Sequence, residues 1–138
     1  MKIISVDLGA VRTGLAICDS GGILASPLGV IEEKNFKKLV QKVSEKAKEN
    51  NAEKIVVGLP VNMDGTKGES AKKSEDFAEM LGKISGIETV LLDERRTTML
   101  ANTYLNMTDT TGKKRKNVID AVSAVIILED YLKGNFKN

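Results

Sequence analysis

The chain has 138 residues, enough for one domain with a substantial core and too few for two. Basic residues exceed acidic ones by only 21 − 19 = +2, which is not the strongly basic balance of a general nucleic-acid-binding protein. No stretch is long and apolar enough to cross a bilayer or to serve as a secretory signal. We therefore expect a single cytoplasmic domain that spans residues 1–138.

The sequence contains no histidine and only one cysteine, Cys18. This composition excludes Ser-His-Asp and Cys-His catalytic arrangements, an internal disulfide and an ordinary structural zinc site. Any bound metal must therefore have oxygen ligands, which favours Mg²⁺ or Mn²⁺.

Three strands are expected first along the chain. Residues 2–7 and 14–19 predict two strands, and Asp19–Gly22 predicts a hairpin that leads into a third strand over residues 22–31. Pro27 has no N–H group to donate to a sheet, so we expect this third strand at a sheet edge.

Helices and strands then alternate. Apolar residues recur at helical spacing in residues 35–50 and 68–85, which predicts two amphipathic helices. Short apolar runs at residues 54–59 and 88–92 predict strands that are buried on both faces. We expect two further helices at residues 96–107 and 117–132, with loops at 60–68 and 108–115.

This order of elements predicts an α/β fold with a five-stranded mixed sheet flanked by helices. Strands that are linked by a helix should be parallel, and the simplest strand order is 3-2-1-4-5. The first strand then lies at the centre of the sheet, and ligands of open α/β sheets bind at the carboxyl ends of the strands.

Three carboxylates occupy positions where such a site would form. Asp7 ends the first strand, Glu94 follows the last strand, and Asp120 lies near the start of the most apolar helix. Each also has an ordinary explanation. Asp7 could form a turn, Glu94 could be a solvated charge, and Asp120 could stand third in a helix capped by Asn117.

Convergence of the three carboxylates would favour a metal site. At about 4 Å and an effective dielectric constant of about 20, each pair would repel by about 4 kcal/mol, and a divalent cation would remove that repulsion. Carboxylates clustered without histidine are also the ligands of paired Mg²⁺ or Mn²⁺ sites that catalyse in-line phosphoryl displacement.

Basic residues lie next to the same segments and are candidates for contacts with nucleic-acid phosphates. They are Arg12, Lys67, Arg95, Arg96, Lys114 and Lys116. The basic run at residues 113–116 could equally be a solvated loop. No aromatic residue interleaves with this run, so stacking on bases is not indicated.

Five segments, taken in this order, carry a resemblance to a known family. They are Val6–Gly9 with Arg12–Ala16, Val56–Pro60, Met63–Thr66, Asp93–Thr98, and Ile119–Ala121 followed by Ile126–Leu128. With these segments the chain resembles the YqgF (RuvX) family of resolvase-like nucleases, in the ribonuclease H-like superfamily. Arg96, where the family usually has Leu or Phe, and Val122-Ser123, where it more often has Ala, are small departures.

The resemblance implies a ribonuclease H-like fold in which Asp7, Glu94 and Asp120 bind metal ions and catalyse cleavage. It implies a nuclease that acts on structured RNA, in maturation of the 5′ end of precursor 16S ribosomal RNA during ribosome biogenesis. The family is also similar to Holliday-junction resolvases, so branched DNA is an alternative substrate.

Two other functions remain open at this point. Residues 7–14 also resemble the first phosphate loop of actin, sugar-kinase and Hsp70-type ATPases, which hold nucleotide between two domains of this kind. A weakly catalytic or non-catalytic RNA-binding or transcription-associated module would keep the same carboxylates. The chain could be a monomer or a homodimer, and a resolvase requires two active sites on one junction.

Overall fold

The computed structural model describes residues 1–19, 24–60, 68–94 and 112–136, and for residues 94, 112–120, 135 and 136 it describes the backbone alone. Among the helices in these ranges, none is long and apolar enough to cross a membrane. The elements in chain order are β1 (Ile3–Asp7), β2 (Arg12–Cys18), β3 (Ala25–Glu32), α1 (Phe36–Glu49), β4 (Lys54–Pro60), α2 (Glu69–Ser85), β5 (Glu88–Glu94) and α4 (Gly112–Phe136).

The strands form one mixed sheet in the order β3-β2-β1-β4-β5, which confirms the predicted order. β1 pairs antiparallel with β2 and parallel with β4, and β5 pairs parallel with β4. β3 pairs antiparallel with β2, and the N–H group of Asp19 donates to the carbonyl of Leu24 at 3.0 Å, whereas residues 20–22 of the predicted hairpin turn lie outside the described residues. Pro27 lies in β3, an edge strand, where proline is tolerated.

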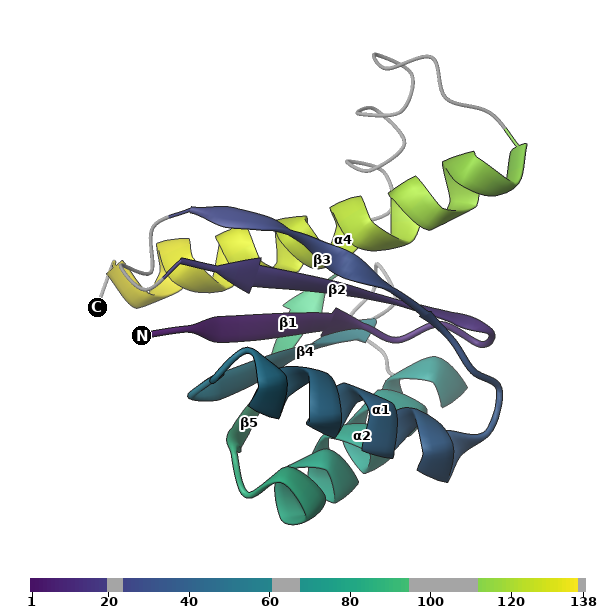
Figure 1. Cartoon of the computed structure of the whole chain (residues 1–138), viewed down its shortest axis with the longest axis horizontal. Helices are drawn as coiled ribbons and strands as arrows, with labels where there is room; N and C mark the ends of the chain where they lie inside the picture. Colours follow the sequence, from purple (N-terminus) through teal and green to yellow (C-terminus); the bar gives the residue numbers. More distant parts are fainter. Residues whose placement is uncertain (20–23, 61–67, 95–111, 137–138) are drawn as a thin grey trace.

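Helices cover both faces of the sheet. Figure 1 shows α1 and α2 on one face and α4 on the other. The buried side chains divide in the same way, because successive residues of a strand point to opposite faces. Ile4 and Val6 of β1 pack in the cluster with α1 and α2, whereas Ile3 packs in the cluster with α4. The position of a residue along a strand therefore tells which helical layer it faces.

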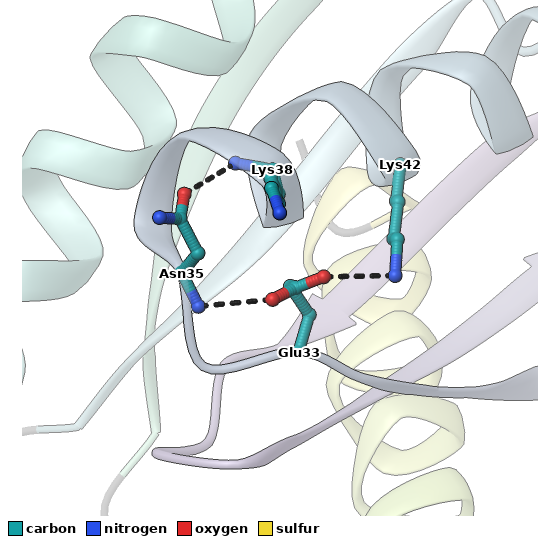
Figure 2. A network of polar contacts seen from close by, with 4 residues as sticks. All are labelled: Glu33, Asn35, Lys38 and Lys42. Carbon is teal, nitrogen blue, oxygen red and sulfur yellow. Dashed lines mark hydrogen bonds and ion pairs between the residues drawn. The ribbon is translucent and has the colours of Figure 1, made fainter.

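A network of side chains fixes the start of α1 (Figure 2). The Asn35 side chain accepts a hydrogen bond from the N–H group of Lys38 at 3.0 Å, which caps the helix. Glu33 accepts a hydrogen bond from the N–H group of Asn35 at 3.1 Å and forms an ion pair with Lys42 at 2.9 Å. The hydrogen bond from Lys42, followed by that from Asn35, lowers the pKa of Glu33. The predicted helix over residues 35–50 is thus confirmed, with asparagines at both caps.

Two predictions from the sequence are wrong. β5 is an edge strand whose Leu91 is 40% exposed, and it is not buried on both faces. α4 begins at Gly112, so residues 112–115 are helical instead of forming part of a loop. Lys and Arg are good helix formers and no proline follows Gly112, so the helix extends through the basic run. The predicted helix at 96–107 lies outside the described residues.

Replacement of the capping residue tests the start of α1. We expect Asn35→Ala to lower the free energy of unfolding by about 0.5–2 kcal/mol, because the N–H group of Lys38 loses its acceptor. Urea unfolding measures this change. Asn35→Asp keeps an acceptor and should retain most of the stability, so an equal decrease in both variants would contradict the capping role.

Candidate functional site

Asp7 lies at the carboxyl end of the central strand. It is the last residue of β1, is half-buried, and stands opposite Gly14 of β2. Alternate residues of a strand point to the same face, so Asp7 shares a face with Ile3. Ile3 packs against residues of α4, so this is the face that α4 covers. In the loop that follows, a Cβ on Gly9 would overlap the carbonyl oxygen of Arg12, so the tight return from β1 to β2 requires glycine.

Glu94 is the last residue of β5, which runs parallel to β1 and β4, so it lies at the same end of the sheet as Asp7. Its backbone pairs with that of Pro60 at the end of β4. Since β4 lies between β1 and β5, the backbones of β1 and β5 are about 10 Å apart. Val6, Val57 and Leu91 are in register, so Glu94 lies two residues further along the sheet than Asp7.

Asp120 lies in the third turn of α4, since that helix begins at Gly112. Asn117 is therefore inside the helix and does not cap it, so the explanation of Asp120 as the third residue of a capped helix is wrong. Asp120 precedes Ala124 by four residues and Ile127 by seven, which places it on the helical stripe that packs on the sheet.

Two buried contacts set the position of α4 over the sheet. The Ser5 hydroxyl, which is fully buried, donates a hydrogen bond to the backbone carbonyl of Ala124. In β4, a Cβ built on Gly58 would lie 2.6 Å from Cδ1 of Ile127, which is itself buried. The missing side chain of Gly58 therefore lets α4 approach the centre of the sheet.

A third contact establishes the direction of α4. Lys54, at the start of β4, donates to the Tyr131 hydroxyl at 2.9 Å and forms an ion pair with Glu88 at 3.2 Å. The bond to Tyr131, followed by that to Glu88, raises the pKa of Lys54. Tyr131 contacts the first residue of β4 and Ile127 contacts the fifth, so α4 runs antiparallel to β1 and β4, as Figure 1 shows.

The predicted basic residues are only partly described. Arg12 begins β2, is half-buried, and has the same place in the strand's alternation as Gly14, the partner of Asp7. Lys114 and Lys116 lie in the first turns of α4, where the backbone alone is described. Lys67, Arg95 and Arg96 lie outside the described residues.

No group of three potential metal ligands lies close together among the described side chains. Of the three predicted carboxylates, Asp7 alone belongs to that set, since Glu94 and Asp120 are described by their backbones. Sequence reasoning did not single out Ser5 or Gly58. The available signal was Ser5 itself, a hydroxyl within the apolar strand IISVD.

A family model described as "RuvX: Holliday junction resolvase" matches residues 1–134. The chain belongs to the RuvX family. A relative from Shouchella clausii, named "Putative pre-16S rRNA nuclease", is 42% identical over 138 residues, with 96% of this chain and 94% of the relative covered. A relative of the same name from Rhodopirellula baltica is 42% identical over 133 residues and is covered over 77% of its length.

The solved structures show the fold of this RuvX chain independently. RuvC from T. thermophilus, in complex with a Holliday junction substrate, matches with a TM-score of 0.61. The match covers 99% of this chain and 96% of RuvC at 12% sequence identity, so it bears on the fold alone. The ribonuclease H-like fold that the sequence predicted is thereby confirmed.

The contact between Gly58 and Ile127 gives a direct test of how α4 is seated. Gly58→Ala should lower the free energy of unfolding by about 1–3 kcal/mol, because the new methyl group overlaps Cδ1 of Ile127. Ile127→Val removes that Cδ1 atom and should cost about 0.5–1.5 kcal/mol by itself. Denaturant unfolding of the double variant should show a smaller decrease than the sum of the two, and strict additivity would contradict the contact.

Proposed function

We propose that the chain is a single-domain, metal-dependent nuclease that hydrolyses phosphodiester bonds in precursor 16S ribosomal RNA. Asp7, Glu94 and Asp120 would be its catalytic, metal-binding carboxylates. The observation that carries this proposal is that β1 and β5 run parallel and end at the same end of the sheet, and that α4 covers one face of that sheet. Each of these elements carries one of the three residues. Family membership adds the reaction class.

The contact between Ser5 and Ala124 supports the placement of Asp120 beside Asp7. Asp7 lies two residues beyond Ser5, about 7 Å along β1. Asp120 lies four residues before Ala124, about 6 Å along α4. Because α4 runs antiparallel to β1, the step from Ser5 to Asp7 and the step from Ala124 to Asp120 lead in the same direction. Positions 7 and 120 therefore lie on the same side of the hydrogen bond between Ser5 and Ala124.

Alternation along β5 supports the inclusion of Glu94. Val90 and Leu92 pack in the cluster that contains α4 residues. Position 94 continues that alternation and belongs to the same face as Asp7 and α4. Positions 7, 94 and 120 would thus lie on the face of the sheet that α4 covers, near the carboxyl ends of the parallel strands.

Three carboxylates on a shared face fit a hard divalent cation, since carboxylate oxygens are preferred ligands of Mg²⁺ and Mn²⁺ and the chain offers no histidine. When bound, Mg²⁺ or Mn²⁺ would supply charge neutralisation at the phosphodiester and activation of water. The carboxylates would hold and orient the cation. Arg12, on the same face at the start of β2, would contact a phosphate of the substrate.

The substrate is proposed from the relatives. The names of the Shouchella and Rhodopirellula proteins support precursor 16S ribosomal RNA. Branched DNA is the second candidate, which the family description and the likeness to RuvC bound to a Holliday junction favour.

Substitution of Asp7 tests the proposed site. We expect Asp7→Asn to reduce the cleavage rate at least about 10²-fold, comparable to the removal of one main electrostatic stabiliser of a transition state. Cleavage is measured with a labelled precursor 16S RNA fragment, a poly-A RNA and a four-way DNA junction, each with Mn²⁺, Mg²⁺ or EDTA. Asp93→Asn is the matched control, because Asp93 lies on the opposite face of β5 from position 94.

The outcomes of that experiment separate the functions considered. Metal-dependent cutting by wild type and the Asp93 variant, but not by Asp7→Asn, supports the proposal and names the substrate. Equal cutting by Asp7→Asn contradicts the site. RNA binding without cutting of any substrate would support the non-catalytic module.

The Ser5 contact yields a second prediction. Ser5→Ala should weaken Mn²⁺ binding and slow cleavage, because α4 loses the hydrogen bond that fixes its depth beside Asp7. The stability cost should be about 1 kcal/mol. Ser44 of α1 is also buried but faces the other layer, so Ser44→Ala provides the control. Calorimetric titration with Mn²⁺ that shows equal affinities in both variants would refute the positioning role.

A further inference from the structure

The solvent side of α1 concentrates positive charge. Lys34, Lys37, Lys38 and Lys42 are exposed; Lys34 directly precedes the N-cap Asn35, Lys37 and Lys38 stand in the first turn of α1, and Lys42 lies one turn after Lys38. Residues 33–42 contain these four lysines and one acidic residue, so their formal charge is 4 − 1 = +3. The whole chain carries +2, so the rest of the sequence has a net charge of 2 − 3 = −1.

Most of this charge has no partner within the described part of the chain. Lys42 pairs with Glu33, whereas Lys34, Lys37 and Lys38 form no ion pair with any described residue. On α2, Lys72 and Lys73 line a hollow beside Phe36 together with Glu69 and Asp76, so their charges are balanced. Three lysines without an ion pair to a described residue therefore lie within five residues at the start of α1, from 34 to 38.

The start of α1 lies at the same end of the sheet as the candidate active site, in the layer on the opposite face. The N–H group of Glu33 donates to the carbonyl of Val11 at 2.9 Å, in the loop that follows Asp7. The other end of α1 leads to the opposite edge of the sheet, where the N–H group of Glu53 donates to the carbonyl of Lys2 at 2.8 Å. The basic segment is therefore at the same end of the sheet as Asp7, in the layer opposite α4 (Figure 1), and a nucleic-acid strand would pass around the β1–β2 loop to reach it.

The fold itself gains little from these lysines. Lys37 and Lys38 stand in the first turn of α1, where the helix dipole disfavours cations. In Figure 2, Lys38 contributes its backbone N–H group to the cap, and no interaction of its ammonium group is drawn. Phosphate oxygens are the complementary partners of such exposed cations.

We propose that Lys34, Lys37 and Lys38 form a phosphate-binding track that holds the nucleic-acid backbone beyond the cleavage site. The proposal rests on the proposed nuclease function for the strand that the track would hold. Lysines contact phosphates as point charges and read no sequence, so the track adds affinity and salt dependence without base preference. A substrate must extend past the β1–β2 loop to reach it.

A matched pair of charge variants on the same helix tests the track. Lys37→Gln/Lys38→Gln removes two charges at the start of α1, and Lys46→Gln/Lys48→Gln removes two charges at the far end of α1. Binding to a long single-stranded precursor 16S RNA fragment is measured by anisotropy in EDTA over a range of salt concentrations. We expect the first variant to reduce the slope of log Kd against log salt by about 1.4, which is roughly 0.7 for each phosphate that a lysine no longer neutralises.

The control variant should keep the wild-type slope. Lys46 and Lys48 stand in the last turn, where cations favour the helix dipole, so a decrease in stability would affect the control more than the test variant. Cleavage of an oligonucleotide too short to reach α1 should be unchanged in both variants. Equal slopes in the two variants, or an unchanged slope in the first, would overturn the track.

The track and the proposed active site can fail separately. If Asp7→Asn cuts like wild type while the slopes differ as expected, the track stands and the proposed active site fails. If Asp7→Asn is inactive and the slopes do not differ, the active site stands and the track is wrong.

Discussion

The proposed site depends on the position of α4 on the sheet, both its distance from the sheet and its place along its own axis. Gly58 leaves space for Ile127, and the Ser5 hydroxyl binds the carbonyl of Ala124, so the helix is held from two strands. A shift by one helical turn would move Asp120 by about 5.4 Å. Mg²⁺ accepts oxygen ligands at about 2.0–2.1 Å, so such a shift would remove a ligand altogether. The packing of α4 on the sheet and the binding of a cation at the proposed site therefore both require α4 to keep the same position along the sheet.

A near-neutral chain can still bind a polyanion when its charges are separated in space. The carboxylates proposed at the edge would repel phosphate until a cation neutralises them, whereas the lysines at the start of α1 attract phosphate without a metal. Binding and cleavage would then have different requirements. RNA could be held in the absence of metal, while hydrolysis would need it.

Local patterns in the sequence were sufficient for the strand order but not for every boundary. Pro27 and the hairpin at Asp19 placed β3 at the edge, and the apolar runs predicted β4 and β5. The apolar residues of β5 could not reveal that no further strand pairs with it, so its burial was overestimated. The basic run before Asn117 has the polar composition of a loop, yet Lys and Arg favour helix and α4 includes them.

The same distinction applies to the candidate site. Asp7 and Glu94 are at strand ends, which a local apolar pattern identifies. The position of α4 follows from a hydrogen bond between residues 119 apart in the sequence, and no local pattern contains that information. The sequence identifies Asp120 as a candidate, but the physical reason to place it near Asp7 comes from contacts between distant residues, Ser5 with Ala124 and Gly58 with Ile127.

The relatives suggest two substrates, precursor 16S RNA and a four-way DNA junction. Hydrolysis of the phosphodiester bond is the same in both, but the number of cuts and of active sites differs. A four-way junction is resolved by paired cuts, which require two active sites in a symmetric assembly. A single cut in a precursor RNA requires one active site and a means of holding the strand beyond it. The proposed lysine track lies on the same chain as Asp7 and at the same end of the sheet, so one copy would provide both. With the track, one chain would be able to hold and cut a single strand, which is what a cut in precursor 16S RNA requires.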